Sequence, residues 1–293
     1  MILRAPAKVN LGLRITGRRP DGYHELESIF APLDLADTVS LEVSDAAKAS
    51  VDFSLSSAAA EVPDGPANLA ARAAHAFLAA ADVARRVSIH LDKHVPAGAG
   101  LGGGSSDAGA VLRGLSELLP GAVPAPALET LALKLGADVP YFLDPRPALV
   151  TGVGEHREVL PRFPARVLLL ANPGEALATE RVYAAFDALS SAAGTPGLRS
   201  FVERGFGGVA PELPVEMLRN DLEPAAVRLC PAVARLREAL ARAGADAVAL
   251  TGSGATVFGV FPGRAEAEAA LGELRAQTPN RTWLRVARTL EAG

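Results

Sequence analysis

The feature that most constrains the fold of this chain is the glycine-rich stretch at residues 95–109, VPAGAGLGGGSSDAG, which leads directly into a helical pattern. Glycine inside a regular element is destabilising by roughly 0.5–1 kcal/mol relative to alanine, because it loses more backbone freedom on folding. Such a cluster is typical of a main chain that needs unusual φ angles or that lies against a ligand. The sequence therefore predicts a loop whose backbone makes the important contacts.

Three other kinds of glycine-rich segment fit this stretch poorly. Gly98, Gly100 and Gly103 have the G-x-G-x-x-G spacing of a dinucleotide-binding turn, but the preceding apolar strand ends at Leu91, too far away for a tight turn. No second strand ending in an acid follows about 20 residues later. A Walker A loop would need a Gly-Lys-Ser/Thr sequence, which is missing. A flexible linker is disfavoured, because a predicted strand enters the loop and a predicted helix leaves it.

The remaining interpretation is an anion-binding loop. Its amide N–H groups are unshielded by side chains and converge with a helix N-terminus, where the helix dipole also favours negative charge. Ser105 and Ser106 add hydroxyl groups that can bind a phosphate oxygen or Mg²⁺. The sequence thus predicts a phosphate site at this loop.

Composition bounds the class of protein. With 293 residues, 49% of them apolar, the chain can bury a large core, and two domains that share an interface are expected. A net charge of -4 with scattered basic residues gives no electrostatic footprint for nucleic acid. No apolar run approaches the roughly 20 residues that span a bilayer, and Arg4 and Lys8 interrupt any signal peptide, so a cytoplasmic protein is expected. The single cysteine, Cys230, excludes an intramolecular disulfide and a cysteine-built metal site.

The hydrophobic periodicity predicts a mixture of strands and helices. In the second half of the chain, their order resembles the β-α-β-β-α-β order of a ferredoxin-like domain with an extra helical insertion. Strands are predicted at 9–15, 28–33, 38–43, 51–55, 86–91, 166–172, 247–251, 256–261 and 281–287, and helices at 68–81, 105–118, 127–136, 180–189, 232–243 and 265–276.

Two further segments are candidates for the site. In LGADVPYF, Asp138 lies between a helix-ending Gly136 and Pro140, which suits either a carboxylate at a domain's inner edge or a turn-capping aspartate. In LTGSGATVF, which begins at Leu250, small residues separate two apolar strands. This segment is either a plain hairpin or a second glycine surface against the ligand, and taken alone it favours the hairpin.

Taken together, these segments resemble one family. PAKVNLGLRITGRRPDGYHELESIF from Pro6, PAGAGLGGGSSDAG from Pro96, LGADVPYFL from Leu135 and LTGSGATVF from Leu250 occur in the order and approximate spacing of the GHMP small-molecule kinases. The resemblance extends to about Phe261. It implies an α+β, two-domain GHMP kinase fold. An ATP-binding domain similar to domain 2 of ribosomal protein S5 is expected over 1–160, and a ferredoxin-like substrate-side domain over 161–293, with both ligands in the cleft between.

The resemblance also implies an activity. DGYHEL, and NDLE at Asn220, mark a branch that uses ATP and Mg²⁺ to phosphorylate the 2-hydroxyl of a cytidine diphosphate-linked methylerythritol, in the non-mevalonate route to isopentenyl diphosphate. In family terms, Lys8 and Asp138 are the catalytic pair. Asp138 would accept the hydroxyl proton, and a nearby ammonium would keep its carboxylate ionised.

Other roles carry over residue by residue from the family. The two tyrosines among the substrate residues would offer ring faces to cytosine. Gly109 stands where relatives have alanine, and we expect it to loosen the helix. No protein ligand for a metal is assigned. The expected ATP-binding residues are Pro96, Ala97, Gly98, Ala99, Gly100, Leu101, Gly102, Gly103, Gly104, Ser105, Ser106, Asn68 and Lys93, and the expected substrate-binding residues are Asn10, Tyr23, His24, Thr179 and Tyr183.

Two alternatives remain at this point. One is another GHMP kinase, of the homoserine or mevalonate type, against which the aromatic and histidine of DGYHEL argue, since a small substrate would not need them. The other is a non-catalytic nucleotide-binding relative, which has no reason to retain both Lys8 and Asp138. The expected partner is a small-molecule substrate, without nucleic acid or membrane, and the expected state is a monomer or weak homodimer.

Overall fold

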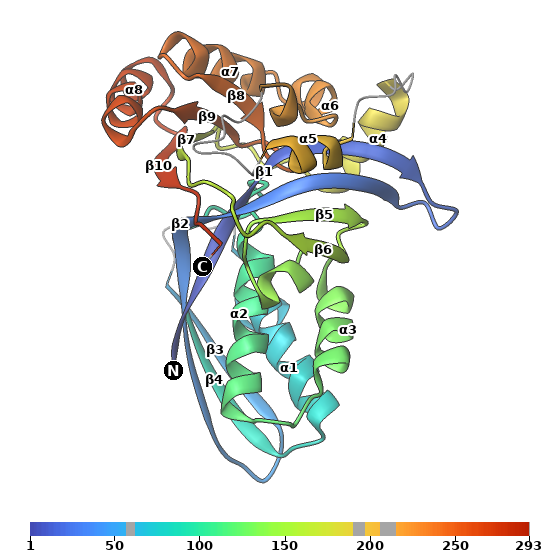
Figure 1. The fold of residues 1–293 in the computed structure, drawn as a ribbon. Helices are drawn as coiled ribbons and strands as arrows, with labels where there is room; N and C mark the ends of the chain where they lie inside the picture. Colours follow the sequence, from blue (N-terminus) through green and yellow to red (C-terminus); the bar gives the residue numbers. More distant parts are fainter. Residues whose placement is uncertain (57–61, 190–196, 206–214, 293) are drawn as a thin grey trace. The chain divides into compact units, whose positions relative to one another are not determined.

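The computed structural model of the chain describes residues 1–56, 62–189, 197–205 and 215–292. Its strands and helices form two compact units, and the fold is drawn in Figure 1. The first unit consists of residues 1–7, 35–97 and 102–145, and the second of residues 8–34, 98–101 and 146–293. Strands β1 (Ile2–Arg18) and β2 (His24–Asp45) contribute residues to both. The division of the chain into domains 1–160 and 161–293 stays a prediction.

The first unit packs helices against a small sheet. Residues 38–45 of β2 pair antiparallel with β4, and β3 pairs parallel with β4. Helix α1 packs against β3, β4, α2 and α3, with its alanine-rich face and Phe77 in the core (Figure 1). The remaining elements of this unit are β3 (Ser50–Ser56), β4 (Arg85–Asp92), α1 (Leu69–Ala81), α2 (Gly103–Leu118), α3 (Ala125–Leu135) and the short 3-10 helices η1 (Gly65–Ala67) and η2 (Pro140–Leu143).

The second unit contains an antiparallel sheet with the strand order β10-β7-β9-β8. Helices α7 and α8 pack against it (Figure 1), and further helices are inserted between β7 and β8, so the predicted ferredoxin-like order is confirmed. Residues 26–30 of β2 also pair with β5, which pairs with β6. The elements are β5 (Ala148–Gly152), β6 (His156–Val159), β7 (Val167–Asn172), α4 (Thr179–Leu189), α5 (Arg199–Gly205), η3 (Val215–Leu218), α6 (Glu223–Leu229), α7 (Ala232–Arg242), β8 (Ala247–Leu250), β9 (Val257–Phe261), α8 (Arg264–Gln277) and β10 (Trp283–Arg288).

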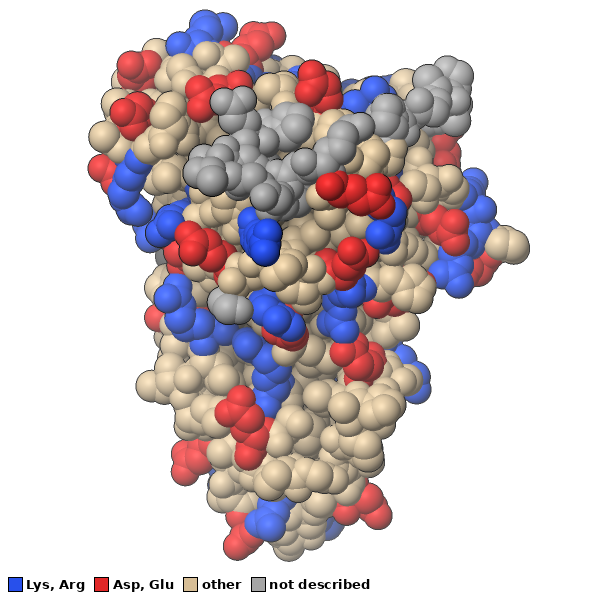
Figure 2. All heavy atoms as spheres, in the orientation of Figure 1, with Lys and Arg blue, Asp and Glu red and all other residues tan. Residues whose placement is uncertain are grey.

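Most predicted elements are present, but three boundaries were wrong. The strand predicted at 9–15 is part of the longer β1, which runs from Ile2 to Arg18. The strands predicted at 28–33 and 38–43 form the single long strand β2, because residues 34–37 between them stay extended. Helix α2 begins at Gly103, two glycines earlier than predicted from helix propensity. In the described ranges, no helix has both the length and the apolar character that crossing a membrane requires. Basic and acidic side chains are interspersed on the face drawn in Figure 2.

A buried ion triad ties β2, the end of β4 and the start of α2 together within the first unit. Lys93 Nζ donates to Asp37 Oδ2 at 2.5 Å and to Asp107 Oδ2 at 2.8 Å. Asp37 Oδ1 also accepts the main-chain N–H groups of His94 and Val95, at 2.5 and 2.8 Å. Buried charges need this degree of pairing to be tolerated. The triad therefore fixes the residues on either side of the glycine-rich loop.

The triad shifts the pKa values of two of its members. Burial raises the pKa of Asp107 from 3.8 to about 7; the Lys93 ammonium opposes this rise, and the Asp37 carboxylate adds to it. Burial alone would lower the pKa of Lys93, but its two carboxylate partners outweigh burial and raise it. Lys93 therefore stays charged, and Asp107 is the member that titrates near neutral pH.

Gly109 marks a close approach between α2 and η2. A Cβ atom at this position would lie 2.5 Å from Phe142 Cβ and 2.9 Å from Phe142 O. Both are atoms that cannot move without shifting the backbone. The structure thus gives Gly109 a packing role in place of the loosening expected from the sequence.

We expect Gly109→Ala to lower the free energy of unfolding by roughly 1–3 kcal/mol, because overpacking outweighs the gain in helix propensity. Gly272→Ala in α8 is the matched control, since a Cβ there meets nothing within 4 Å. It should stabilise by about 0.4–1 kcal/mol. Urea unfolding of both variants checks this, and a stabilised Gly109→Ala protein would contradict the packing role.

Asp107 should give the protein a pH-dependent stability. Between pH 3.8 and about 7 the folded state holds a proton on Asp107 that the unfolded chain has lost. The free energy of unfolding therefore falls as the pH rises through this window, by at most about 1.4 kcal/mol per pH unit. Above the window, the stabilisation that comes from protonated Asp107 has been lost. Asp107→Asn should lose this slope.

The measurement is urea unfolding at pH 5 and pH 8. Wild type should lose more stability than Asp107→Asn between the two values. The surface variant Asp52→Asn, whose side chain is 52% exposed beside Arg86, is the control and should retain the wild-type slope. Parallel curves for wild type and Asp107→Asn would disprove the assignment.

Candidate active site

The glycine-rich loop has the unusual backbone that its sequence predicts. Gly98, Gly100 and Gly102 have φ angles of +62°, +77° and +70°, in the left-handed region that favours glycine. Gly102 is also the N-cap residue of α2 and carries no side chain that could cap the helix. The first turn of α2 therefore has no side-chain acceptor from its own cap.

The amides of this loop are unpaired. In the part of the chain that the structure describes, no main-chain N–H from Ala97 to Ser105 donates to another protein group. Buried or half-buried N–H groups are normally paired, and the unpaired ones at a helix N-terminus are available to an anion. The loop therefore presents a run of hydrogen-bond donors without acceptors, followed by the positive end of α2.

The second unit packs a second glycine-containing loop, residues 251–256, against Gly100. A Cβ at Gly100 would lie 2.5 Å from Thr251 O and 3.0 Å from Gly254 O. Thr251 Oγ1 also lies 3.3 Å from Gly100 O and can donate to it. The loop joins the antiparallel strands β8 and β9, so the segment is a hairpin and also a glycine surface in contact with the first loop.

Asn220 holds the 251–256 loop in place. Its Nδ2 donates to Leu250 O and to Gly252 O, both at 2.9 Å, and its Oδ1 accepts from Leu222 N at 2.9 Å. The side chain is 3% exposed. The segment NDLE was a family marker in the sequence, and these hydrogen bonds give its asparagine a structural role.

Lys8 and Asn10 lie two residues apart on β1 and contact each other. Lys8 Nζ donates to Asn10 Oδ1 at 2.7 Å and lies 4.5 Å from the centre of the Phe30 ring. The Lys8 main-chain N–H donates to Leu101 O of the glycine-rich loop at 2.9 Å. Both side chains are buried, at 3% and 2% exposure. The substrate contact expected of Asn10 stays a prediction.

Asp138 lies in the turn between α3 and η2 of the first unit and is partly exposed. Burial raises the pKa of Tyr141 well above its ordinary value, and the charges of Asp138 and Asp144 add to this rise. Lys8 belongs to the second unit. The pairing of Lys8 with Asp138 therefore stays a prediction.

Asn68 and Lys93, expected near the nucleotide, have partners within the first unit. Asn68 Oδ1 caps α1 by accepting the N–H of Ala70 at 2.9 Å, and its Nδ2 donates to Pro63 O at 2.8 Å. Lys93 is the centre of the ion triad, with a side chain 4% exposed. Their contacts with ATP stay predictions, and Asp37 and Asp107 are partners that the sequence analysis missed.

The remaining substrate candidates lie in the second unit. The His24 and Tyr183 rings have centroids 4.9 Å apart with planes inclined by 31°. His24 Nε2 lies 2.6 Å from Asp187 Oδ1, a partner not identified from the sequence. Thr179 Oγ1 lies 3.0 Å from Ser253 Oγ of the 251–256 loop, and Tyr23 is 65% exposed. His24 and Tyr183 are thus brought together by folding.

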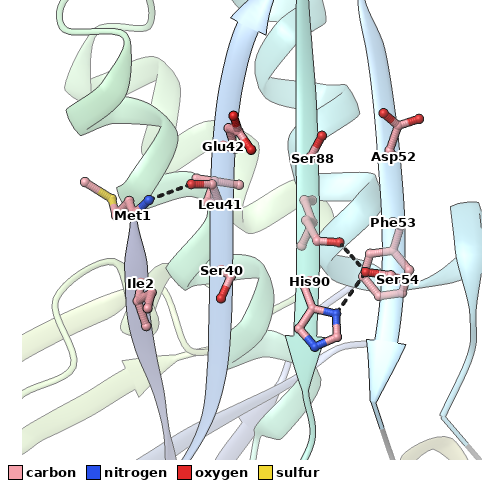
Figure 3. Close-up of a pocket in the computed structure, with 11 residues that line it drawn as sticks. Met1, Ile2, Ser40, Leu41, Glu42, Asp52, Phe53, Ser54, Ser88 and His90 are labelled. Atoms are coloured by element: carbon pink, nitrogen blue, oxygen red, sulfur yellow. Dashed lines mark hydrogen bonds between the residues drawn. The ribbon is translucent and has the colours of Figure 1, made fainter.

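The hollow drawn in Figure 3, of about 700 Å³, lies on the open sheet face of the first unit and contains none of the predicted site residues. His90 there contacts the hydroxyls of Ser54 and Ser56, at 2.9 and 3.3 Å. Such alternating polar residues are typical of a solvated strand face. Among the described residues, no group of three His, Cys, Asp or Glu side chains is placed to hold a metal.

Comparisons with known proteins give the family of the chain. Residues 68–144 match the GHMP kinases N terminal domain and residues 210–280 the GHMP kinases C terminal domain. A 4-diphosphocytidyl-2-C-methyl-D-erythritol kinase of Citrifermentans bemidjiense is 40% identical over 93% of this chain and 93% of its own. The corresponding enzyme of Geobacter metallireducens is 38% identical over 98% of this chain and 97% of its own.

Solved structures give the same result. A crystal structure of 4-(cytidine 5'-diphospho)-2C-methyl-D-erythritol kinase is 38% identical and has a TM-score of 0.77, covering 99% of this chain and 100% of its own. Mevalonate kinase of L. major, at 14% identity and a TM-score of 0.73 over 100% of this chain and 97% of its own, shares the fold alone. The predicted α+β fold is confirmed. The chain therefore belongs to the GHMP kinases and, among them, to the 4-diphosphocytidyl-2-C-methyl-D-erythritol kinase family.

Proposed function

We propose that this chain uses ATP to phosphorylate the 2-hydroxyl of 4-diphosphocytidyl-2-C-methyl-D-erythritol, giving the 2-phosphate and ADP, as a step in isopentenyl diphosphate biosynthesis. The observation that carries the proposal is the run of unpaired amides from Ala97 to Ser105 at the start of α2. A triphosphate supplies the negative oxygens that such a run lacks. Family membership indicates which molecule accepts the phosphoryl group.

The reaction needs little covalent chemistry from the protein. Phosphoryl transfer depends mostly on positioning and on stabilising charge on the transferred group. In the proposal the loop amides and the α2 N-terminus hold the phosphates, Asp138 accepts the proton of the hydroxyl, and the Lys8 ammonium stabilises negative charge.

Mg²⁺ fits two oxygen atoms near the start of α2. Ser106 Oγ and Asp107 Oδ1 are buried and have no hydrogen-bond partner in the described residues. Hydroxyl and carboxylate oxygens are ligands that Mg²⁺ prefers, and it commonly binds through one carboxylate plus substrate phosphates. In the proposal these two atoms hold the ion, which when bound neutralises phosphate charge, while Asp107 Oδ2 remains with Lys93.

His24, Tyr183, Thr179 and Tyr23 are proposed to bind the cytidine part of the substrate. The His24–Tyr183 ring contact and the exposed Tyr23 ring offer apolar faces on which a pyrimidine can stack. The expectations of a cytoplasmic location and of a monomer or weak homodimer stay predictions.

A coupled assay of ADP release tests the proposal. With ATP and Mg²⁺ we expect turnover on 4-diphosphocytidyl-2-C-methyl-D-erythritol, with kcat/KM at least about 10³-fold above that on homoserine or mevalonate, because those acceptors cannot use the ring contacts. Faster turnover on either small acceptor would reassign the substrate, and ATP binding without turnover on all three would indicate a non-catalytic relative.

Asp138→Asn should lower kcat by roughly 10² to 10⁴ and leave ATP affinity little changed, because the amide cannot accept the hydroxyl proton. Asp144→Asn, which removes a neighbouring carboxylate at the end of η2, is the matched control and should retain near-wild-type kcat. Steady-state kinetics and nucleotide titration measure the two effects. Near-normal turnover of Asp138→Asn would exclude Asp138 as the base.

A further inference from the structure

One contact of the Lys8 ammonium is with the side-chain amide of Asn10, which could present either its oxygen or its nitrogen to the ammonium. An ammonium group can only donate hydrogen bonds, whereas the Asn10 amide has an oxygen that accepts and a nitrogen that donates. Lys8 Nζ therefore needs Asn10 Oδ1 facing it, as observed at 2.7 Å. If the amide turned over, Nδ2 would face the ammonium and the contact would be repulsive. Something must fix the amide's orientation.

Ser28 fixes it through an ordered chain of hydrogen bonds. The main-chain carbonyl of Gly12 can only accept, so the Ser28 hydroxyl donates to it, at 2.7 Å. The Ser28 oxygen is then left to accept from Asn10 Nδ2, at 2.8 Å. This contact directs Asn10 Oδ1 toward Lys8. The donor-to-acceptor direction of the whole series of hydrogen bonds is therefore set by the Gly12 carbonyl.

The surroundings make this orientation strict. Ser28 is 0% exposed and Asn10 2% exposed, so water offers neither side chain an alternative partner. Thr251 Oγ1 accepts the Asn10 main-chain N–H at 3.0 Å and lies 3.3 Å from Asn10 Oδ1, where its hydroxyl can donate. A reversed Asn10 amide would lose its contact with Lys8, and Ser28 could donate to the reversed oxygen only by giving up its hydrogen bond to Gly12 O. Because leaving a buried polar group unpaired costs free energy, the hydrogen-bond series keeps this one direction.

We propose that Ser28 is a positioning residue that acts through Asn10 on the Lys8 ammonium, and that Asn10 itself serves this chain of contacts. The inference rests on the proposed function, because the effect on turnover follows from the role of Lys8 there. Ser28 is fully buried, so the proposal gives it no contact with either ligand. In the proposal the Ser28 hydroxyl fixes the position of the Lys8 ammonium, the β1 side chain that stabilises negative charge in the reaction.

The test compares Ser28→Ala with Ser28→Thr. The alanine variant removes the hydroxyl and should lower kcat by about 10- to 10²-fold, as a small misplacement of a catalytic group does, with the KM for ATP unchanged. The threonine variant keeps a hydroxyl in a strand position that suits a β-branched residue and should recover most of the kcat. Thermal unfolding of each variant verifies that it is folded. Equal loss in both variants, or loss in neither, would overturn the proposal.

A readout that needs no substrate separates this inference from the proposed function. The chain has four lysines, so the ¹³Cε and ¹⁵Nζ signals of labelled lysine are few. Ser28→Ala should move the Lys8 signals, while those of Lys48 and Lys134 stay in place. Unmoved Lys8 signals would contradict the inference. Moved signals in an enzyme whose wild type does not turn over the cytidyl substrate would instead place the failure in the proposed function.

A double-mutant cycle covers the case of a poorly folded Ser28→Ala protein. Asn10→Ala removes the acceptor directly and should lower kcat as much as Ser28→Ala does, and the double variant should lose no more than either single one. Ser28→Cys, with its weaker donor, replaces Ser28→Ala if the latter does not fold and should give an intermediate kcat. Additive losses would mean that the two residues act separately and would overturn the proposal.

Discussion

The structure depends above all on a stretch of main chain that needs glycine at several positions and that leaves its amides unpaired. Left-handed φ angles at Gly98, Gly100 and Gly102 turn the loop tightly ahead of α2, and no N–H from Ala97 to Ser105 in the described chain donates to another protein group. A second requirement applies at Gly100, where any side chain would overlap the carbonyl oxygen of Thr251. The left-handed φ angle and the close approach of Thr251 therefore both require glycine at position 100. The unpaired main-chain N–H groups of the loop are donors of the kind that phosphate oxygens accept from.

Buried polar groups fix the residues around this loop. On the side of the first unit, Lys93 between Asp37 and Asp107 fixes the residues that enter and leave it. In the second unit, Asn220 holds the 251–256 loop and Asn10 holds Lys8. Such arrangements contribute little net stability, since each buried group is expensive to desolvate, but they allow few alternatives in geometry. A kinase needs that rigidity because its catalysis consists mainly of holding phosphates and one hydroxyl in register.

The sequence was informative where the signal is local. Periodicity located most helices and strands, and the glycine-rich stretch indicated its own unusual backbone. The phosphate site predicted there stays a prediction. Family motifs then pointed to Lys8, Asp138 and the His24 region. The residues that the sequence did not predict are single polar side chains whose partners are remote in sequence. Asp37 binds Lys93, 56 positions away, and Ser28 binds Asn10, 18 positions away. Nothing in a strand's alternation distinguishes a buried serine or aspartate with such a partner from an exposed one. For the same reason the extended segment around Asp37 was predicted as a break between two strands.

The central claim is that the unpaired loop amides bind the phosphates of ATP. A crystal structure of the protein with a non-hydrolysable ATP analogue tests it most directly. The account predicts β- and γ-phosphate oxygens at about 2.7–3.2 Å from several main-chain nitrogens between Ala97 and Ser105. A nucleotide bound with those nitrogens still unpaired, or with its phosphates held elsewhere, would contradict it.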